Sequence, residues 1–161
     1  MAILGLQGVR GGVGTTSVTA ALAWSLQLLG ESVLVIDACA DNLLRMSFNV
    51  DFTRTEGWAR ALLDDKDWRD AGLRYTSQLD LLPFGQLTTT ERENEAAYQR
   101  LFSQFTLALQ SLKEKGHYQW ILLDRAGVGL FPGDLAAQPP AGSAAKRYVA
   151  VADCRSLCAD L

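Results

Sequence analysis

The sequence predicts a three-layer α/β fold in which helices pack on both faces of a mostly parallel sheet. Three observations predict it. Short apolar runs without charge, which are typical of buried strands, recur along the first 124 residues. Helical stretches lie between these runs. The first strand, a Gly-rich loop, a helix and the second strand fit within 37 residues, the size of one crossover unit between parallel strands.

The first crossover unit is the most clearly defined. The uncharged run from Ala2 to Gln7 predicts a buried strand. The stretch from Thr15 to Leu29 is rich in Ala and Leu and predicts a helix, which Gly30 ends. A second buried strand is expected from Ser32 to Ile36, followed by Asp37. Since parallel sheets bind ligands at the carboxyl ends of their strands, we expect the functional site at that edge.

The elements that follow keep the same alternation of apolar runs and helical stretches. In chain order, we expect a loop with a short helix over 38–56, a weak helix over 57–63, a strand over 79–82 closed by Pro83, a long helix over 90–115 ended by Gly116, and a strand over 119–123 ended by Asp124.

The pattern changes near residue 125. The last 36 residues contain three of the chain's four prolines and show no amphipathic period, which is typical of loop or disorder. We therefore predict a nucleotide-binding domain over 1–124 and an irregular or aberrant tail over 125–161. Within the tail, 148–152 is a candidate for one more short strand.

Composition and charge exclude several classes of function. The net charge of −3 leaves no global basic field for nucleic acid or anionic lipid. Cys39, Cys154 and Cys158 have neither zinc-ligand spacing nor the density of a disulfide framework, which predicts reduced thiols in the cytoplasm. No apolar run reaches the roughly 18 residues that a membrane span needs. We expect a cytoplasmic protein with no direct nucleic-acid contact and only indirect membrane contact.

The Gly-rich segment after the first strand is the candidate site. Phosphate binding needs main-chain N–H groups that converge on one point, with a helix N-terminus behind them, and glycines permit those backbone angles. The hydroxyl of Thr16 stands at the start of the helix, where it can bind Mg²⁺ beside a phosphate. The predicted nucleotide-binding residues are Arg10, Gly11, Gly12, Val13, Gly14, Thr15, Thr16 and Ser17.

This segment resembles the deviant Walker A motif, Lys-Gly-Gly-Val-Gly-Lys-Thr-Thr, of the MinD/ParA family of ATPases. The matching residues are Gly11, Gly12, Val13, Gly14 and Thr16. Over residues 1–124 the chain is similar, more closely, to the BcsQ-type family of bacterial cellulose biosynthesis. The stretches that carry this similarity are 4–16, 37–39, 41–45, 47–52, 57–64 and 72–86. The resemblance implies a P-loop NTPase-like fold, ATP and Mg²⁺ as cofactors, and a homodimer that encloses nucleotide between its subunits.

Two loop positions depart from the ATPase family. Thr15 occupies the position of the P-loop lysine, and Arg10 occupies that of the signature lysine. A lysine neutralises the β- and γ-phosphates during phosphoryl transfer, whereas a threonine donates only a hydrogen bond. A guanidinium suits phosphate well, and the resemblance implies that Arg10 reaches the nucleotide of the other subunit.

The resemblance also assigns metal and catalytic positions. Asp37 matches the first aspartate of the family's Asp-x-Asp switch and Asp124 matches the Walker B aspartate. Together with Thr16, they are the predicted Mg²⁺ site, partly through water. Cys39 stands where the family has the aspartate that orients the attacking water, and a neutral thiol fills that role poorly. No catalytic residue is assigned, and Asp41 remains a candidate that requires the loop to shift.

Together these residues predict a protein that binds ATP and Mg²⁺ and hydrolyses ATP weakly or not at all. The resemblance implies that it regulates or localises the cellulose synthase complex, through other subunits of that complex, at the inner-membrane face or a cell pole. A scaffold that binds no nucleotide is the alternative, because Thr15 replaces lysine. A dinucleotide-binding oxidoreductase is a weaker one, because no third glycine follows Gly12-Val13-Gly14.

The resemblance stops at residue 125. The family's Walker B aspartate is followed within two residues by proline, whereas Arg125-Ala126-Gly127 follows here. The family domain runs to roughly 250 residues, a size that single α/β domains reach, so the chain is short by about a third. We therefore expect a frame disruption or truncation, an incomplete C-terminal third of the fold, and an exposed sheet edge that favours aggregation. A non-functional product is a further alternative.

Overall fold

The computed structural model describes residues 2–8, 12–125 and 147–151, the last range by its backbone alone. In this part of the chain, the strands form one sheet in the order β3-β4-β2-β5-β1-β6. The strands are β1 Ala2–Gly8, β2 Val33–Asp37, β3 Leu73–Arg74, β4 Leu79–Leu82, β5 Trp120–Arg125 and β6 Arg147–Val151. Neighbouring strands are parallel except β3 and β4, which are antiparallel. The predicted mostly parallel sheet is therefore confirmed.

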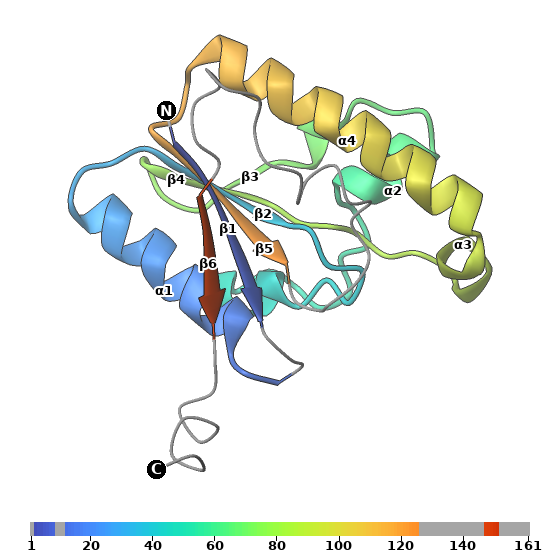
Figure 1. Ribbon diagram of the computed structural model, residues 1–161, viewed down its shortest axis with the longest axis horizontal. Coiled ribbons are helices and arrows are strands. Elements are labelled where there is room, and N and C mark those ends of the chain that lie inside the picture. The colour runs from blue at the N-terminus through green and yellow to red at the C-terminus, as the bar shows by residue number, and fades with distance from the viewer. Residues whose placement is uncertain (1, 9–11, 126–146, 152–161) are drawn as a thin grey trace.

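Helices cover both faces of this sheet, as Figure 1 shows. One face packs against α1, and the other packs against α2 and α4. The described helices are α1 Thr15–Leu28, α2 Trp58–Leu63, α3 Thr89–Glu93 and α4 Glu95–Lys115, with short 3-10 helices η1 Leu44–Phe48 and η2 Trp68–Ala71. The three-layer prediction is confirmed. None of the helices in the described ranges is both long and apolar enough to cross a bilayer.

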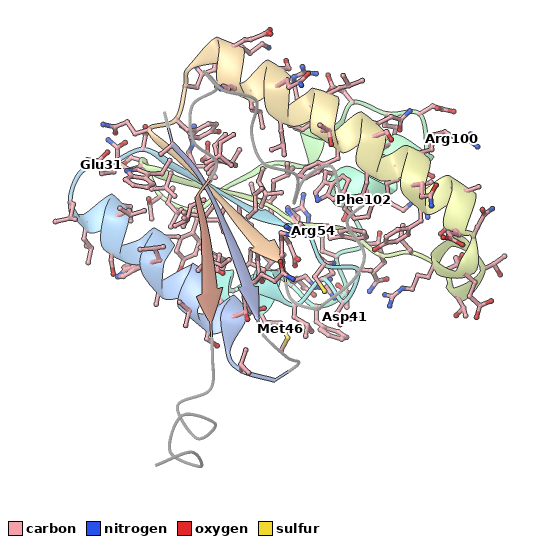
Figure 2. All side chains as sticks on the ribbon, viewed as in Figure 1. Glu31, Asp41, Met46, Arg54, Arg100 and Phe102 are labelled. Atoms are coloured by element: carbon pink, nitrogen blue, oxygen red, sulfur yellow. The ribbon has the colours of Figure 1, made fainter. Side chains whose placement is uncertain are left out.

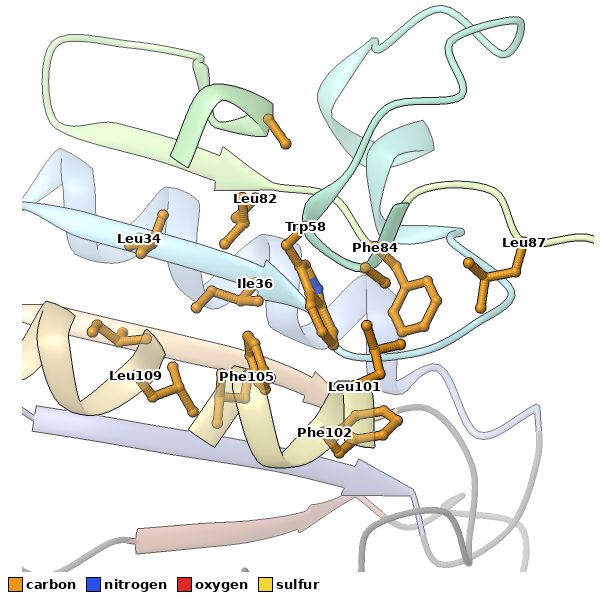
Figure 3. Packing of buried hydrophobic residues seen from close by; sticks show 14 residues of the cluster. Leu34, Ile36, Trp58, Leu82, Phe84, Leu87, Leu101, Phe102, Phe105 and Leu109 are labelled. Atoms are coloured by element: carbon orange, nitrogen blue, oxygen red, sulfur yellow. The ribbon is translucent and has the colours of Figure 1, made fainter. Parts of the chain in front are cut away.

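An aromatic core fills the space between the sheet and the α2 and α4 layer (Figure 3). The fully buried ring of Trp58 stacks on Phe105 of α4, with ring centroids 4.0 Å apart, and meets Phe84 edge-on. Burying one such side chain stabilises the fold by roughly 1.5–3 kcal/mol. The main-chain N–H of Trp58 also donates to the carbonyl of Pro83 at 2.9 Å. The start of α2 is thereby fixed against the end of β4.

Small side chains let α1 lie close to the opposite face. Its buried residues are Thr15, Thr19 and Ala23, which are spaced four apart and so share one side of the helix. Gly30 follows the helix with a φ of +85°, a left-handed conformation that glycine adopts without strain, as predicted for its end. This packing brings the first turns of α1 to the carboxyl end of β5.

Two elements differ from the sequence prediction. The helix expected over 90–115 is two helices, because the side chain of Asn94 accepts a hydrogen bond from the Ala97 N–H at 3.1 Å and starts α4 separately. A capping box between Thr88 and Glu91 starts α3 before it. The strand β3 was not expected, because two residues carry no periodicity. The strand expected over 148–152 is present as β6.

Candidate nucleotide-binding site

The candidate site lies at the carboxyl edge of the sheet, where β1, β2 and β5 end side by side. Asp37 closes β2, and Asp124 lies opposite it in the parallel register of β2 and β5. Asp124 is also in register with Leu6 of β1, two residues before Gly8 ends that strand. The two acidic residues that the sequence places at strand ends are therefore neighbours in the sheet. Figure 2 shows Asp41 at this edge and Glu31 at the opposite one.

Two glycines in the described part of the loop have left-handed backbone conformations. Gly12 has a φ of +74° and Gly14 a φ of +87°, both left-handed. A Cβ at either position would meet nothing within 4 Å, so conformation rather than space requires glycine there. Gly14 also accepts the first hydrogen bond of α1, from the Val18 N–H at 3.0 Å. Arg10 and Gly11 lie outside the described residues.

Threonines of α1 connect this loop to Asp124. A hydrogen bond from the Thr16 side chain lowers the pKa of Asp124, although burial raises it more strongly. The Thr19 hydroxyl donates to the carbonyl of Thr15 at 2.8 Å and lies 3.5 Å from Oδ1 of Asp124. The other carboxylate oxygen, Oδ2, is buried and has no hydrogen-bond partner among the described residues. The structure thus brings Thr16 and Asp124 together.

Asp37 holds the loop that follows β2. Its Oδ1 accepts from the Cys39 N–H at 3.0 Å and its Oδ2 accepts from the Leu44 N–H at 3.1 Å. Burial raises the pKa of Asp37 to about 7; these two hydrogen bonds oppose the shift, while the charges of Asp124 and Asp41 add to it. A buried carboxylate with another beside it favours a cation nearby.

The donor set fits a magnesium ion. The described residues contain no group of three or more His, Cys, Asp and Glu side chains arranged to hold a metal. Magnesium rarely needs one, because it keeps several waters and binds through one or two carboxylates and the phosphates of its substrate. Two buried carboxylates, an unpartnered Oδ2 on Asp124 and the nearby hydroxyl of Thr16 meet that requirement.

The segment after β2, residues 38–43, is held from the α3 side. The guanidinium of Arg92 donates from Nη2 to the carbonyl of Ala40 at 2.9 Å, and its Nη1 lies 3.7 Å from Oδ1 of Asp41. Burial raises the pKa of the Cys39 thiol to about 11, and the charges of Asp37 and Asp41 contribute to that rise. The thiol is therefore neutral at pH 7, and Asp41 points to Arg92.

Sequence reasoning missed the residues that fix this segment. Arg92 lies 52 residues from Ala40 in a stretch predicted as continuous helix, so nothing local connects the two. The side chain of Asn42 accepts from the Phe84 N–H at 3.1 Å, and its φ of +52° is one that asparagine tolerates better than most residues. The presence of an asparagine in a predicted loop was the one sequence feature that could have indicated this contact.

A family model and several curated relatives match most of the chain. The family model described as "Cellulose biosynthesis protein BcsQ" matches residues 1–158. The cellulose biosynthesis protein BcsQ of Escherichia coli K12 is 72% identical over 124 residues, which are 77% of this chain and 50% of that protein. The chain spans about half the length of the curated relatives it matches.

Solved structures share the fold. Cobyrinic acid a,c-diamide synthase from Mycobacterium smegmatis, with a bound ATP analogue and magnesium, superposes with a TM-score of 0.64 at 22% identity, over 81% of this chain and 53% of that one. The septum site-determining protein MinD of Pyrococcus horikoshii, complexed with Mg-ADP, gives a TM-score of 0.58 at 27% identity, over 80% of this chain and 51% of that one.

Proposed function

The chain belongs to the BcsQ family of cellulose biosynthesis proteins, and on that premise we propose that it binds ATP with magnesium at the carboxyl edge of its sheet. The observation that supports this most is the combination of a left-handed glycine loop with two buried carboxylates. Gly12 and Gly14 allow main-chain N–H groups to converge at the start of α1. Thr16, Asp37 and Asp124 then supply the oxygens beside the phosphates.

Each of these residues has a distinct part in holding the ligand. Bound Mg²⁺ supplies positive charge against the phosphate oxygens. Thr16 would offer its hydroxyl to the metal, and Asp37 and Asp124 would hold it through water. Thr15 donates a hydrogen bond where related ATPases place an ammonium group. The likeness to a MinD structure that contains Mg-ADP supports this choice of cofactor.

Hydrolysis in this proposal is slow or absent. The thiol of Cys39 stays protonated, with its pKa raised to about 11, so it is a poor base for an attacking water. The carboxylate of Asp41 is exposed and faces the guanidinium of Arg92 at 3.7 Å. No lysine precedes Lys66, so the described loop offers no ammonium charge for phosphoryl transfer. We expect turnover below about 1 s⁻¹, the low end for enzymes.

Assembly is also part of the proposal. We expect ATP to be enclosed between two copies of the chain, with Arg10 of each copy reaching the nucleotide of the other. The dimer would then act on other subunits of the cellulose synthase complex at the cytoplasmic face of the inner membrane. Light scattering after size exclusion tests the first step: the mass should double with ATP and Mg²⁺ and stay single with ADP. A single mass in both would contradict the sandwich.

Calorimetric titration with ATP and Mg²⁺ tests nucleotide binding directly, and the chain offers a matched pair of variants. Gly14→Ala places a side chain at a φ of +87° inside the loop, and Gly30→Ala does the same at +85° at the far end of α1. Neither Cβ meets another atom within 4 Å, so the two variants carry similar backbone strain. We expect Gly14→Ala to weaken ATP binding at least tenfold and Gly30→Ala to leave it unchanged.

The outcomes of this titration separate the hypotheses. If Gly14→Ala and Gly30→Ala weaken ATP binding equally, backbone strain in general, and not a change in the glycine loop, accounts for the effect. If the unaltered chain, verified as folded by circular dichroism, binds neither ATP nor ADP at millimolar concentration, the scaffold alternative replaces the nucleotide proposal.

A further inference from the structure

A cavity opens at the edge of the sheet opposite the candidate nucleotide site. Its volume is about 640 Å³, within the usual range for ligand pockets. It lies where β2 and β4 begin, between the β3 end of the sheet, η2 and the last turn of α4. Ser32 before β2 and Gln78 before β4 both line it. The cavity therefore shares no lining residue with the glycine loop or its carboxylates.

The floor of this cavity, which we call the basal cavity, is apolar. Leu34 and Leu82 are buried in the sheet, and Leu112 of α4 is half-buried beside them. The rings of Trp68 and Tyr118, both half-buried, form part of its wall. The Tyr118 hydroxyl donates to Oδ2 of Asp80 at 2.7 Å, so its ring is fixed in place. An aliphatic or aromatic side chain would find apolar contacts here.

The rim of the basal cavity is cationic. Three of its lining residues, Arg69, Arg74 and Lys115, carry permanent positive charge, whereas Asp80 is the one carboxylate. Asp80 is already engaged, because Arg74 donates to it from Nε at 3.0 Å and Tyr118 donates to it as well. A basic rim on a chain with a net charge of −3 is a local feature that favours an acidic partner.

Two of the rim cations, Arg69 and Lys115, are exposed to solvent, although Nη2 of Arg69 donates to Oγ of Ser111 at 3.3 Å. Arg69 pairs with Asp67 at 3.1 Å, but both side chains are about half exposed, and such pairs contribute little. Its guanidinium also lies 4.6 Å from the ring centroid of Trp68, which orients it across that ring. Lys115 forms no ion pair with a described residue. A hydrogen bond from the Arg69 main chain lowers the pKa of Asp67, and the charges of Arg69 and Lys115 lower it further.

We infer that the basal cavity receives an acidic peptide segment of a partner protein, with one apolar side chain on the leucine floor and carboxylates at Arg69 and Lys115. The basal cavity fits a small molecule less well. Small-ligand sites bury roughly 70–90% of the ligand surface, whereas Arg69 and Lys115 are exposed at the mouth of this cavity. In the described chain β3 is the last strand on this side, and an extended segment can use its outer main-chain groups. This inference is independent of nucleotide binding.

Selection from a random peptide library tests the inference and requires no named partner. A phage library of random 12-residue peptides is selected on the full chain, and in parallel on the double variant Arg69→Glu and Lys115→Glu. The matched control is Lys113→Glu, an exposed lysine in the same turn of α4 that does not line the cavity. We expect sequences that combine Asp or Glu with Leu, Phe or Trp to be enriched on the unaltered chain and on the control, and lost on the double variant.

A synthetic copy of the most enriched peptide then gives the affinity. We expect binding at least tenfold weaker to the double variant, unchanged to Lys113→Glu, and weaker in 0.5 M than in 0.05 M NaCl. Binding is followed by the change in tryptophan fluorescence. The Trp68→Phe variant shows how much of that change arises from Trp68 in the cavity wall. Circular dichroism verifies that every variant is folded.

Three results would overturn the inference. One is the same enriched composition on the unaltered chain and the double variant. Another is equal weakening by Lys113→Glu, which would show an effect of net charge alone. The third is a Trp68 response to 3-phenylpropionate as strong as the response to the peptide, which would make the cavity a small-molecule site.

Discussion

The indole Nε1 of Trp58 donates a hydrogen bond to the main-chain carbonyl of Asp37 at 2.7 Å, and both groups are fully buried. The aromatic core on the α4 side is thereby joined to the candidate metal site. Trp58→Phe keeps most of the ring but leaves that carbonyl without its donor, which costs about 1–3 kcal/mol of unfolding free energy. We expect urea denaturation to show this loss and calorimetry to show weaker Mg-ATP binding. Trp120→Phe is the control, and an equal effect on binding there would contradict the link.

Cys39→Asp should raise ATP turnover. It restores a carboxylate where the thiol, with its pKa raised to about 11, stays neutral. A positioned base contributes roughly 10²–10⁴-fold to such reactions, and we expect at least about tenfold here because Thr15 still replaces lysine. Phosphate release under saturating ATP measures it. Cys39→Ser, which is similar in size and uncharged, should leave turnover unchanged; a rise with serine would assign the effect to something other than the carboxylate.

Arg92→Gln should release the segment over 38–43 without unfolding the protein. The variant removes the guanidinium that bonds the Ala40 carbonyl and faces Asp41. Hydrogen exchange followed by mass spectrometry should show faster exchange in 38–43 and unchanged exchange in β2 and β5. The control is Arg100→Gln, an exposed residue on α4 (Figure 2). If exchange in the segment is equal in the two variants, Arg92 does not hold it.

The stability of the metal-free protein should fall as pH rises from about 4 to 7. Burial raises the pKa of Asp37 from 3.8 to about 7, so between those values the folded state binds more protons than the unfolded state. The unfolding free energy then decreases with rising pH and levels off above about 7. Asp37→Asn should flatten this slope in urea denaturation series. Mg-ATP should flatten it too, because a cation favours the charged carboxylate.

Gly57→Ala should destabilise the chain strongly. A Cβ at Gly57 would collide with the main chain of Phe84 and Gly85, neither of which can move without shifting the end of β4. Overpacking of this kind costs at least about 1–3 kcal/mol. At Gly72 the nearest atom to a Cβ, the Arg69 carbonyl oxygen, is 3.2 Å away, so Gly72→Ala is the milder control. Thermal denaturation compares Gly57→Ala with Gly72→Ala. Equal midpoints would contradict the close approach of Gly57 to the main chain of Phe84 and Gly85.

Much of the fold follows from local sequence patterns. The charge-free run before the glycine loop and the apolar runs before Asp37 and Asp124 are each recognisable within a few residues. The structure brings the ends of these strands together, and β5 continues to Arg125. Gly30 could be predicted as the end of α1 because a left-handed residue after a helix favours glycine.

Other features depend on contacts between distant segments. The break at Asn94 was missed because the flanking residues all favour helix, although asparagine is a strong helix start. The Arg92 contact with Ala40 and the Trp58 contact with Asp37 join residues 52 and 21 positions apart. The basal cavity draws its lining from 32–34, 68–82 and 112–118, which become neighbours only after the sheet has formed.

Because the register of β2 and β5 sets Asp37 opposite Asp124, the candidate site forms only when the sheet has formed. Thr16 and these two aspartates belong to separate elements, so an unfolded chain offers the ligand no equivalent set of oxygens. The proposed nucleotide should therefore stabilise the native state, by about 2.7 kcal/mol at one hundred times its dissociation constant. We expect the melting temperature of the protein to rise with the fraction of sites that hold nucleotide, in a cell extract as well as in purified form.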